Sequence, residues 1–403
     1  MSINQYRDSY STSKYFQFLV VIRYLYFAYV FVSLIAGPLN IPFAKIGSLW
    51  VGAVAFLIFL RKPHSFNRIS PMHIFPFLIT VTTCGIMSII HGLSWSDPIW
   101  NVVFRLMVVW ILNSYIVSEI IITPKCYEIM VVVISITLVI GYFSSAAILG
   151  DYNRLSIMNG SSFGNSNDFA HWCSFCVLSF LFMSFRLRDV FQKSFFLIMA
   201  AVFLILALST FSRATLLGLA ASGIFYLFLL ITKSDLKRKN FLANIVLIGL
   251  LFLVILQLNV FETISLGYSN RWEEETGRME LWPAAIEVIR KAPVWGWGNL
   301  YQEIYMPLKN SSTSTHNPFL RLATYAGVVP SIILLMYYTK GFVKSYIDYR
   351  TNSETIYVVV LLFFMFLAIN TSNWEFVHLP MTIVFSLVFS LSYEAMELDG
   401  SKL

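Results

Sequence analysis

The chain has 403 residues, of which 58% are hydrophobic and only 12% are charged, with a mean hydropathy of +0.72. A soluble domain carries about twice that share of charged residues, whereas the apolar residues here form blocks of about 20, the length that crosses a bilayer. These features exclude a soluble globular protein, and the net charge of +7 indicates basic loops beside a membrane rather than a nucleic-acid partner.

Hydropathy along the chain predicts about twelve transmembrane helices, and hence an all-α, polytopic membrane protein. The polar N-terminal stretch leads directly into the first apolar block, so we expect no cleavable signal peptide. The predicted spans lie near residues 16–36, 43–60, 74–90, 99–121, 127–149, 168–185, 194–211, 214–231, 241–260, 318–339, 356–370 and 377–393.

Basic residues concentrate on one side of this predicted topology. That side holds about 17 of the 28 lysines and arginines, a bias that predicts cytoplasmic loops and cytoplasmic termini there. The opposite side then carries one long loop. We therefore expect three parts: helices one to nine in 1–260, an external loop domain in 261–317, and helices ten to twelve in 318–403.

One segment of the long loop has helical periodicity. In TGRMELWPAAIEVIRK the apolar residues recur at helical spacing, which predicts a helix lying along the membrane surface. Its predicted apolar face consists of Met279, Trp282, Ile286 and Ile289.

A C-x-x-C pair occurs at Cys173 and Cys176, a spacing that can indicate metal binding or redox chemistry. Here it lies inside the apolar stretch HWCSFCVLSF, with no second pair of ligands nearby. We interpret the two cysteines as small packing residues.

Polar residues gather at the external entrance to the sixth span, in GSSFGNSNDFAHW (160–172). Asn167 or Asp168 can cap the helix that follows. A cap needs only one such residue, and Asn165 is a third, so a role in binding is equally open.

Two arginines stand out on the external side, which is otherwise poor in basic residues. Arg213 lies in a short hairpin between two apolar spans, and Arg278 opens the predicted surface helix. Either could simply reach lipid phosphate or water, but a guanidinium group is also well suited to bind a phosphate through two parallel hydrogen bonds. The PVWGWGN turn (293–299) that follows is either an interfacial aromatic anchor or a surface on which sugars stack.

The stretch STSTHNPFL (312–320) ends the long loop. Asn317-Pro318 predicts a turn that starts a helix with Pro318 at its first position. This places His316 just outside the membrane, where an imidazole can accept a proton near neutral pH. A structural role is the alternative.

The order of these motifs resembles the O-antigen ligase and polymerase superfamily. The resemblance is carried by SRATLLGL, GRMELW, PVWGWGN and THNPFLRLATYAGVVPSIILL, between about residues 160 and 340. FGNSND is similar to the family's Gly-Asn-Pro-Asn turn, with Ser166 in place of the proline. The first 150 residues match only as a series of apolar spans.

The resemblance implies a GT-C-like, inverting glycosyltransferase of the bacterial inner membrane, with its active site on the periplasmic face and no metal or other cofactor. Its donor would be an undecaprenyl-diphosphate-linked oligosaccharide. Its acceptor would be a second lipid-linked glycan or the lipid A core, with membrane lipids and a chain-length regulator as further partners. Arg213 and Arg278 match the family's diphosphate-binding arginines, and His316 matches its catalytic base. Further substrate-binding candidates are Asn165, Asn167, Asp168, Asn317 and Trp282.

Two acceptors, and a second class of function, remain open. A polymerase transfers the growing glycan to another lipid-linked repeat unit, and the polar turn at 164–168 favours this reading by analogy. A ligase transfers the finished glycan to lipid A core. A flippase or exporter for the same lipid is a further alternative, although the polar residues cluster at one face rather than at mid-membrane. A scaffold without catalytic activity would not need His316.

Overall fold

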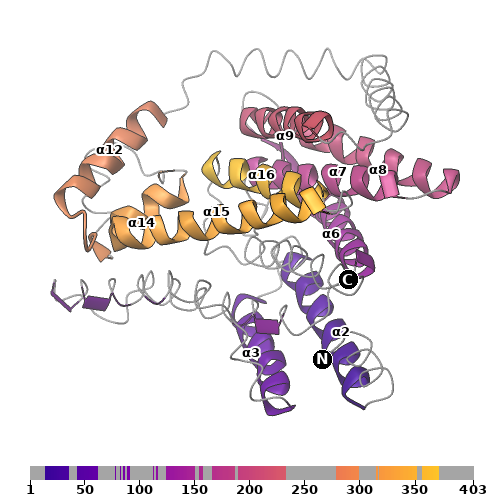
Figure 1. Ribbon diagram of the computed structural model, residues 1–403, viewed down its shortest axis with the longest axis horizontal. Helices are drawn as coiled ribbons and strands as arrows, with labels where there is room; N and C mark the ends of the chain where they lie inside the picture. The colour runs from indigo at the N-terminus through magenta and orange to yellow at the C-terminus, as the bar shows by residue number, and fades with distance from the viewer. Residues whose placement is uncertain are drawn as a thin grey trace.

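The computed structural model describes residues 14–35, 43–61, 124–149, 154–157, 166–186, 189–232, 278–298, 315, 317–351 and 356–371, with single positions between 78 and 116 (Figure 1). The predicted spans at 241–260 and 377–393, and most of those at 74–90 and 99–121, lie outside these residues.

The described residues form helices, the turns that join them and one pair of short strands. Within the described part of the chain, four helices are long and apolar enough to cross a membrane: α6 (Pro124–Ser145), α7 (Ser166–Arg186), α8 (Val190–Leu208) and α9 (Arg213–Thr232). Three more contain shorter apolar stretches: α2 (Lys14–Ile35), α3 (Phe43–Arg61) and α16 (Ile356–Thr371). Each of these seven helices coincides with a predicted span. The remaining helices are α12 (Arg278–Lys291), α14 (Pro318–Ala326) and α15 (Val328–Thr351).

The outer faces of the long helices are apolar. On α8, the side chains of Phe191, Phe195 and Ile198 are exposed. A row of exposed aromatic and aliphatic side chains is costly in water but normal where lipid surrounds the helix. The exposed apolar face of α8 therefore supports the interpretation of a membrane helix.

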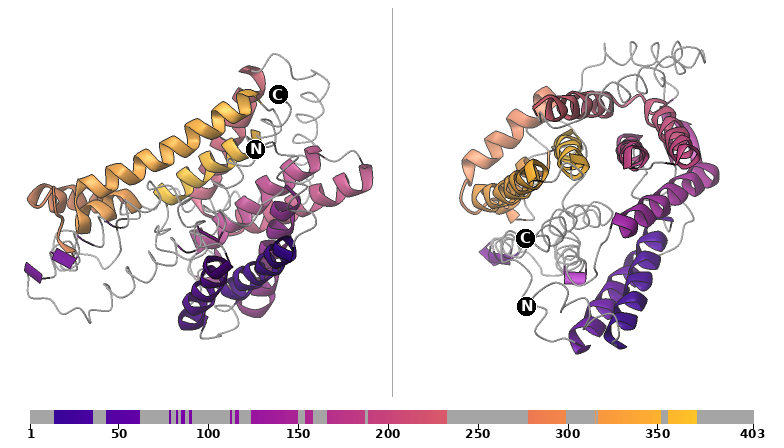
Figure 2. Two further views of the ribbon diagram at one scale, coloured as in Figure 1. Left: turned by 60° about the horizontal axis from the view of Figure 1, so that its bottom comes forward. Right: turned by 45° about the vertical axis from the view of Figure 1, so that its right-hand side comes forward.

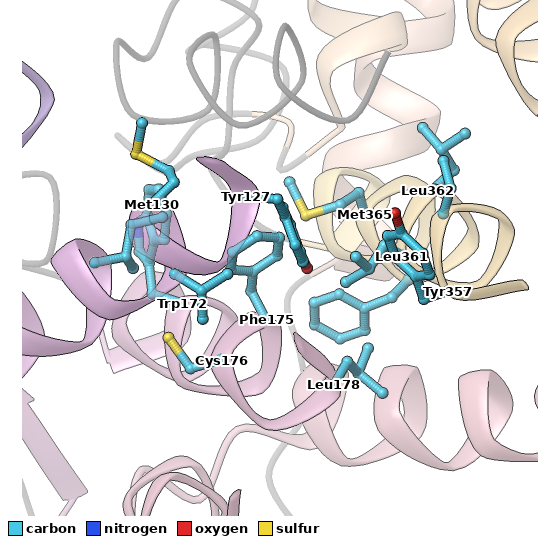
Figure 3. Close-up of a cluster of buried hydrophobic side chains, with 14 of the residues drawn as sticks. Tyr127, Met130, Trp172, Phe175, Cys176, Leu178, Tyr357, Leu361, Leu362 and Met365 are labelled. Atoms are coloured by element: carbon cyan, nitrogen blue, oxygen red, sulfur yellow. The ribbon is translucent and has the colours of Figure 1, made fainter. Parts of the chain in front are cut away.

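Helix α7 forms the centre of the bundle, where it packs against α6, α8, α9 and α16. All residues from 168 to 180 are buried. In the cluster drawn in Figure 3, Tyr127 of α6 donates a hydrogen bond to Ser179 Oγ (2.7 Å), and its ring lies 5.7 Å from that of Tyr357 of α16. Cys173 and Cys176 are fully buried free thiols, which confirms their interpretation as packing residues.

A two-stranded antiparallel hairpin follows α6 and was not predicted. Its strands are β1 (Ala146–Leu149) and β2 (Arg154–Ile157), with Ala146 paired to Ile157. The predicted span 127–149 was therefore too long, because helix α6 ends at Ser145. The apolar run continues into the strand, and hydropathy alone does not separate a helix from an apolar strand.

The predicted span 318–339 is also wrong as a single helix. The chain turns at Gly327, where φ is +86°, between α14 and α15. Ser331 Oγ of α15 donates to the carbonyl of Phe319 (2.9 Å), so α14 folds back along α15. The segment 340–350, which the predicted spans leave as a loop between 339 and 356, continues α15 instead. Figures 1 and 2 show α12 and α14 gathered at one end of this long helix.

Candidate active site

One residue from each of the helices α7, α9 and α16 lies at the same level along the bundle. A Cβ on Gly218 of α9 would lie 3.4 Å from the ring of Phe364 of α16, and His171 of α7 lies 6.3 Å from the same ring, between centroids. Towards the other end of α16, the ring of Tyr357 lies near Phe182 of α7 (5.9 Å). Helix α16 therefore runs antiparallel to α7. The ring of Tyr226 of α9 also lies near Phe182 (6.0 Å), so α9 runs the same way as α7.

Because of this alignment, the ends of three helices lie at a similar level. From the shared level of His171, Gly218 and Phe364, Asp168 lies three residues away, Arg213 five and Asn370 six, all in the same direction along the bundle. At 1.5 Å per residue, these positions lie about 5–9 Å beyond that level. The starts of α7 and α9 and the end of α16 thus form one face of the bundle.

Arg213 is the first residue of α9, and its side chain is half-buried. The corner before it is tightly built: Ser212 Oγ accepts from the Thr215 backbone N–H (3.4 Å), and the Thr210 hydroxyl donates to the Ala207 carbonyl (2.6 Å). No acidic residue lies in the first turn of α9. The guanidinium and the positive end of the helix dipole therefore both attract an anion at this point.

The hairpin adds a strand to this corner. The backbone N–H of Leu155 in β2 donates to the carbonyl of Ser209 (3.1 Å), and β2 also contacts α7. The polar loop between the fifth and sixth predicted spans is thus attached to the corner that carries Arg213.

Helix α12 begins at Arg278 as predicted, but its buried face differs from the prediction. Leu281, Ala284, Ala285 and Val288 form that face, packed against Trp297 and Leu320. Trp282 and Ile286, on the predicted face, are about two-fifths exposed (39% and 41%). The periodicity singled out the larger side chains, but Leu320 of the neighbouring α14 packs against the cluster that contains the two alanines.

Trp282 connects α12 to the end of the long loop. Its indole N–H donates to the backbone carbonyl of Thr315 (3.0 Å), the residue before His316. Arg278 lies four residues earlier in α12 and hence on the same face of the helix, one turn away. The indole N–H is therefore already paired within the protein, although part of the ring is exposed.

The PVWGWG turn packs against the α14–α15 corner. Gly296 and Gly298 have positive φ angles (64° and 54°). The Trp297 backbone N–H donates to the Thr324 carbonyl (2.9 Å), and its indole N–H donates to the Val288 carbonyl at the end of α12 (2.9 Å). Trp297 is thus a structural residue, whereas the ring of Trp295 is exposed.

Asn317 caps α14, and Pro318 occupies the start of that helix, as predicted. The Asn317 side-chain oxygen accepts from the backbone N–H groups of Phe319 and Leu320 (both 3.0 Å). Its amide nitrogen donates to the side-chain oxygen of Asn370, at the end of α16 (3.1 Å). His316 and Asn165 lie outside the described residues, but both chain neighbours of His316 are described.

Asn167 and Asp168 lie within the first turn of α7, because that helix begins at Ser166. The prediction that either one caps the helix is therefore wrong, since a cap precedes the first turn. Asp168 is buried, and its Oδ1 has no hydrogen-bond partner among the described residues. A buried carboxylate oxygen left in this state can accept a hydrogen bond from a bound hydroxyl group.

Sequence reasoning missed Asn370. The only signal was a polar residue in the last turn of an apolar span, which is also how many spans end. Its partner, Asn317, is 53 residues away along the chain, so only the fold reveals the pair.

Comparison with known proteins finds a match for one segment of the chain. Residues 196–335 match a protein-family model described as O-antigen ligase, whereas no curated protein matches the chain. The match includes Arg213, Arg278 and His316, and it confirms the resemblance deduced from the motifs. Over residues 196–335, about a third of the chain, the protein is thus similar to the O-antigen ligase family, whose members are polytopic membrane enzymes, glycan ligases and polymerases, that assemble bacterial surface polysaccharides.

Proposed function

We propose that the chain is a metal-independent, inverting glycosyltransferase that moves a glycan from an undecaprenyl-diphosphate carrier to a sugar hydroxyl. The observation that carries the proposal is the convergence of distant segments at one end of the bundle. Arg213 begins α9 at that end, and Asn317, next to His316, is hydrogen-bonded to α16 there. The helix that starts with Arg278 is bonded to the other neighbour of His316, Thr315.

Arg213 and Arg278 stabilise the leaving group in this mechanism. As the bond between C1 of the sugar and the phosphate oxygen breaks, the electron pair leaves with the diphosphate. Two guanidinium groups at the low-dielectric edge of a membrane stabilise that negative charge. At Arg213 the positive end of α9 acts in the same direction.

His316 acts as the general base. The acceptor hydroxyl oxygen attacks C1 from the side opposite the diphosphate, so the anomeric centre inverts, and the imidazole takes the hydroxyl proton. The imidazole must come within about 3 Å of that oxygen. Asp168, Asn167 and Asn165 are candidates for holding the acceptor sugar, with Trp282 and the amide of Asn317 on the other side of the site.

We place this end of the bundle on the periplasmic face, with the termini in the cytoplasm, on the basis of the loop charges. The exposed side chains of Lys291 and Arg350 allow a direct test, since they lie in α12 and at the far end of α15. In intact spheroplasts, an impermeant maleimide should label Lys291→Cys and not Arg350→Cys, with the parent chain as background. The reverse pattern would overturn the orientation and the site with it.

We favour polymerase as the specific reaction, with the polar turn at 164–168 as support, while the description of the matched family keeps the ligase reading open. The glycan profile of a deletion strain separates the two. A single repeat unit attached to lipid A core indicates a polymerase, whereas complete lipid-linked chains left unattached indicate a ligase. For a transporter, the purified protein with lipid-linked donor and acceptor would form no glycosidic bond.

A further inference from the structure

We infer that Asn370, in the last turn of α16, is a positioning residue that holds the loop segment carrying His316 in place for catalysis. The inference rests on the proposed function, because it gives His316 the role of base. Asn370 lies outside the matched segment 196–335 and outside every motif described above.

Asn317 and Asn370 are linked in a chain of hydrogen bonds, in which each bond orients the next side chain. Asn370 donates its own amide N–H to the Phe366 carbonyl one turn earlier in α16 (2.8 Å), which orients its side-chain oxygen. That oxygen accepts from the amide nitrogen of Asn317 (3.1 Å). The oxygen of Asn317 is used by the cap of α14, so the amide has one orientation that satisfies both partners.

The other neighbour of His316 is held as well. The Thr315 carbonyl accepts the indole N–H of Trp282 (3.0 Å), and the Thr315 hydroxyl donates to the Asn317 carbonyl (3.0 Å). Thr315 is 1% exposed. The backbone is thus attached to α12 on one side of His316 and to α16 on the other.

The bond to Asn370 is not needed to attach α14 to its surroundings. Phe319 packs against Phe366 (6.1 Å between ring centroids) and Tyr338 (6.0 Å), and its carbonyl accepts from Ser331. These contacts hold the helix, whereas the Asn317–Asn370 bond sets the position of the residue next to His316. A base displaced by about 1 Å can lose about 10²-fold in rate, so this single bond acts mainly on catalysis.

Two variants break the bond from opposite sides. Asn370→Ala removes the acceptor. Asn317→Ser keeps a good cap for α14 but is too short to reach α16. The matched control is Ser331→Ala, which removes a different side-chain hydrogen bond to the same helix.

The first measurement does not depend on activity. Purified protein is treated with diethyl pyrocarbonate at one pH, and acylation of His316 is followed by mass spectrometry, with fully buried His171 as the internal reference. We expect the His316 rate to rise at least about threefold in Asn370→Ala and in Asn317→Ser, because the bond that holds its chain neighbour is lost, and to stay unchanged in Ser331→Ala. An unchanged or lower rate in the first two variants overturns the inference.

The second measurement is the transfer rate from a purified lipid-linked donor. Both bond-breaking variants should lower kcat about 10–100-fold, with KM for the donor within about twofold. In a His316→Ala background, Asn370→Ala should have no further effect; a loss that persists there overturns the inference. If His316→Ala leaves transfer unchanged, or no transfer occurs, the proposed function fails, and the acylation rates still decide whether Asn370 positions His316.

Discussion

The membrane bundle and the layer formed by α12, the 293–298 turn and α14 are held together differently. In the bundle, buried hydroxyls such as Ser174 and Ser184 bond to carbonyls of their own helix, and the helices meet through aromatic rings and small residues. In the outer layer, side chains bond across elements, as Trp297 does with Val288. The bundle therefore depends mainly on shape, with a few tyrosine hydroxyls such as Tyr127 bonded across helices, whereas the outer layer depends on individual hydrogen-bond donors.

The physical cause is the size of the apolar core in each region. Helix α12 buries its own cluster of four residues, two of them alanines (Leu281, Ala284, Ala285 and Val288), whereas α14 adds Leu322 and Ala326 to the main core. Such a cluster provides little free energy to set one orientation, so directional bonds complete it. The proposed site lies where the two regions meet, and predictions that separate them follow from the largest effect to the smallest.

Removal of the proposed base should have the largest effect. His316→Ala should lower transfer about 10²–10⁴-fold while donor binding persists. The wild-type rate should rise with pH through the range in which an ordinary imidazole loses its proton, about 6.5, because the base must be neutral. A reconstituted assay across pH measures both effects. A mutant that keeps its rate and the rising limb would limit His316 to a structural role.

The arginines come next. Lysine carries the charge but not the two-pronged donor, so Arg213→Lys and Arg278→Lys should each lower transfer about tenfold, and alanine about 10²–10³-fold. Arg290→Lys, on an exposed position of the same α12, is the control and should stay within about twofold. Rates are compared at equal amounts of membrane-inserted protein. Normal transfer by both lysine variants would remove the arginines from the mechanism.

Alanine substitution of two glycines tests the difference between the regions directly. An added Cβ at Gly327 would lie 2.1 Å from the Val294 carbonyl oxygen at a φ of +86°, so Gly327→Ala should cost about 2–4 kcal/mol. At Gly218 the nearest atom, in the ring of Phe364, is 3.4 Å away, an ordinary van der Waals contact, so Gly218→Ala should change stability by less than about 1 kcal/mol. Thermal unfolding in detergent measures both. Equal decreases in the unfolding temperature of the two variants would contradict the distinction between the regions.

The smallest expected effect is on stability, in two variants that each lose one side-chain hydrogen bond. Trp297→Phe leaves the Val288 carbonyl unpaired in the last turn of α12 and should cost about 1–3 kcal/mol. Tyr127→Phe removes a bond to Ser179, whose hydroxyl still donates to Phe175, and should cost about 0.6 kcal/mol. The unfolding temperatures of the two variants should therefore differ. A larger loss for Tyr127→Phe would mean that the bundle also depends on polar bonds.

The sequence by itself determined the membrane class, the approximate positions of seven helices, the start of α14 at Pro318 and the resemblance of residues 196–335 to the O-antigen ligase family. These features depend on local composition, capping residues and the order of motifs, all of which are visible along the chain.

Only the tertiary structure decided which parts of the chain meet. The corner at Gly327, the buried face of α12 and the Asn317–Asn370 bond each depend on a partner distant in sequence: Val294, Leu320 and Asn370. An apolar or polar residue has the same hydropathy whichever neighbour it contacts, so hydropathy and periodicity indicate that a face can be buried but not by what. The shared level of Arg213 and Asn370 arises from the antiparallel packing of α9 and α16, which no local pattern specifies.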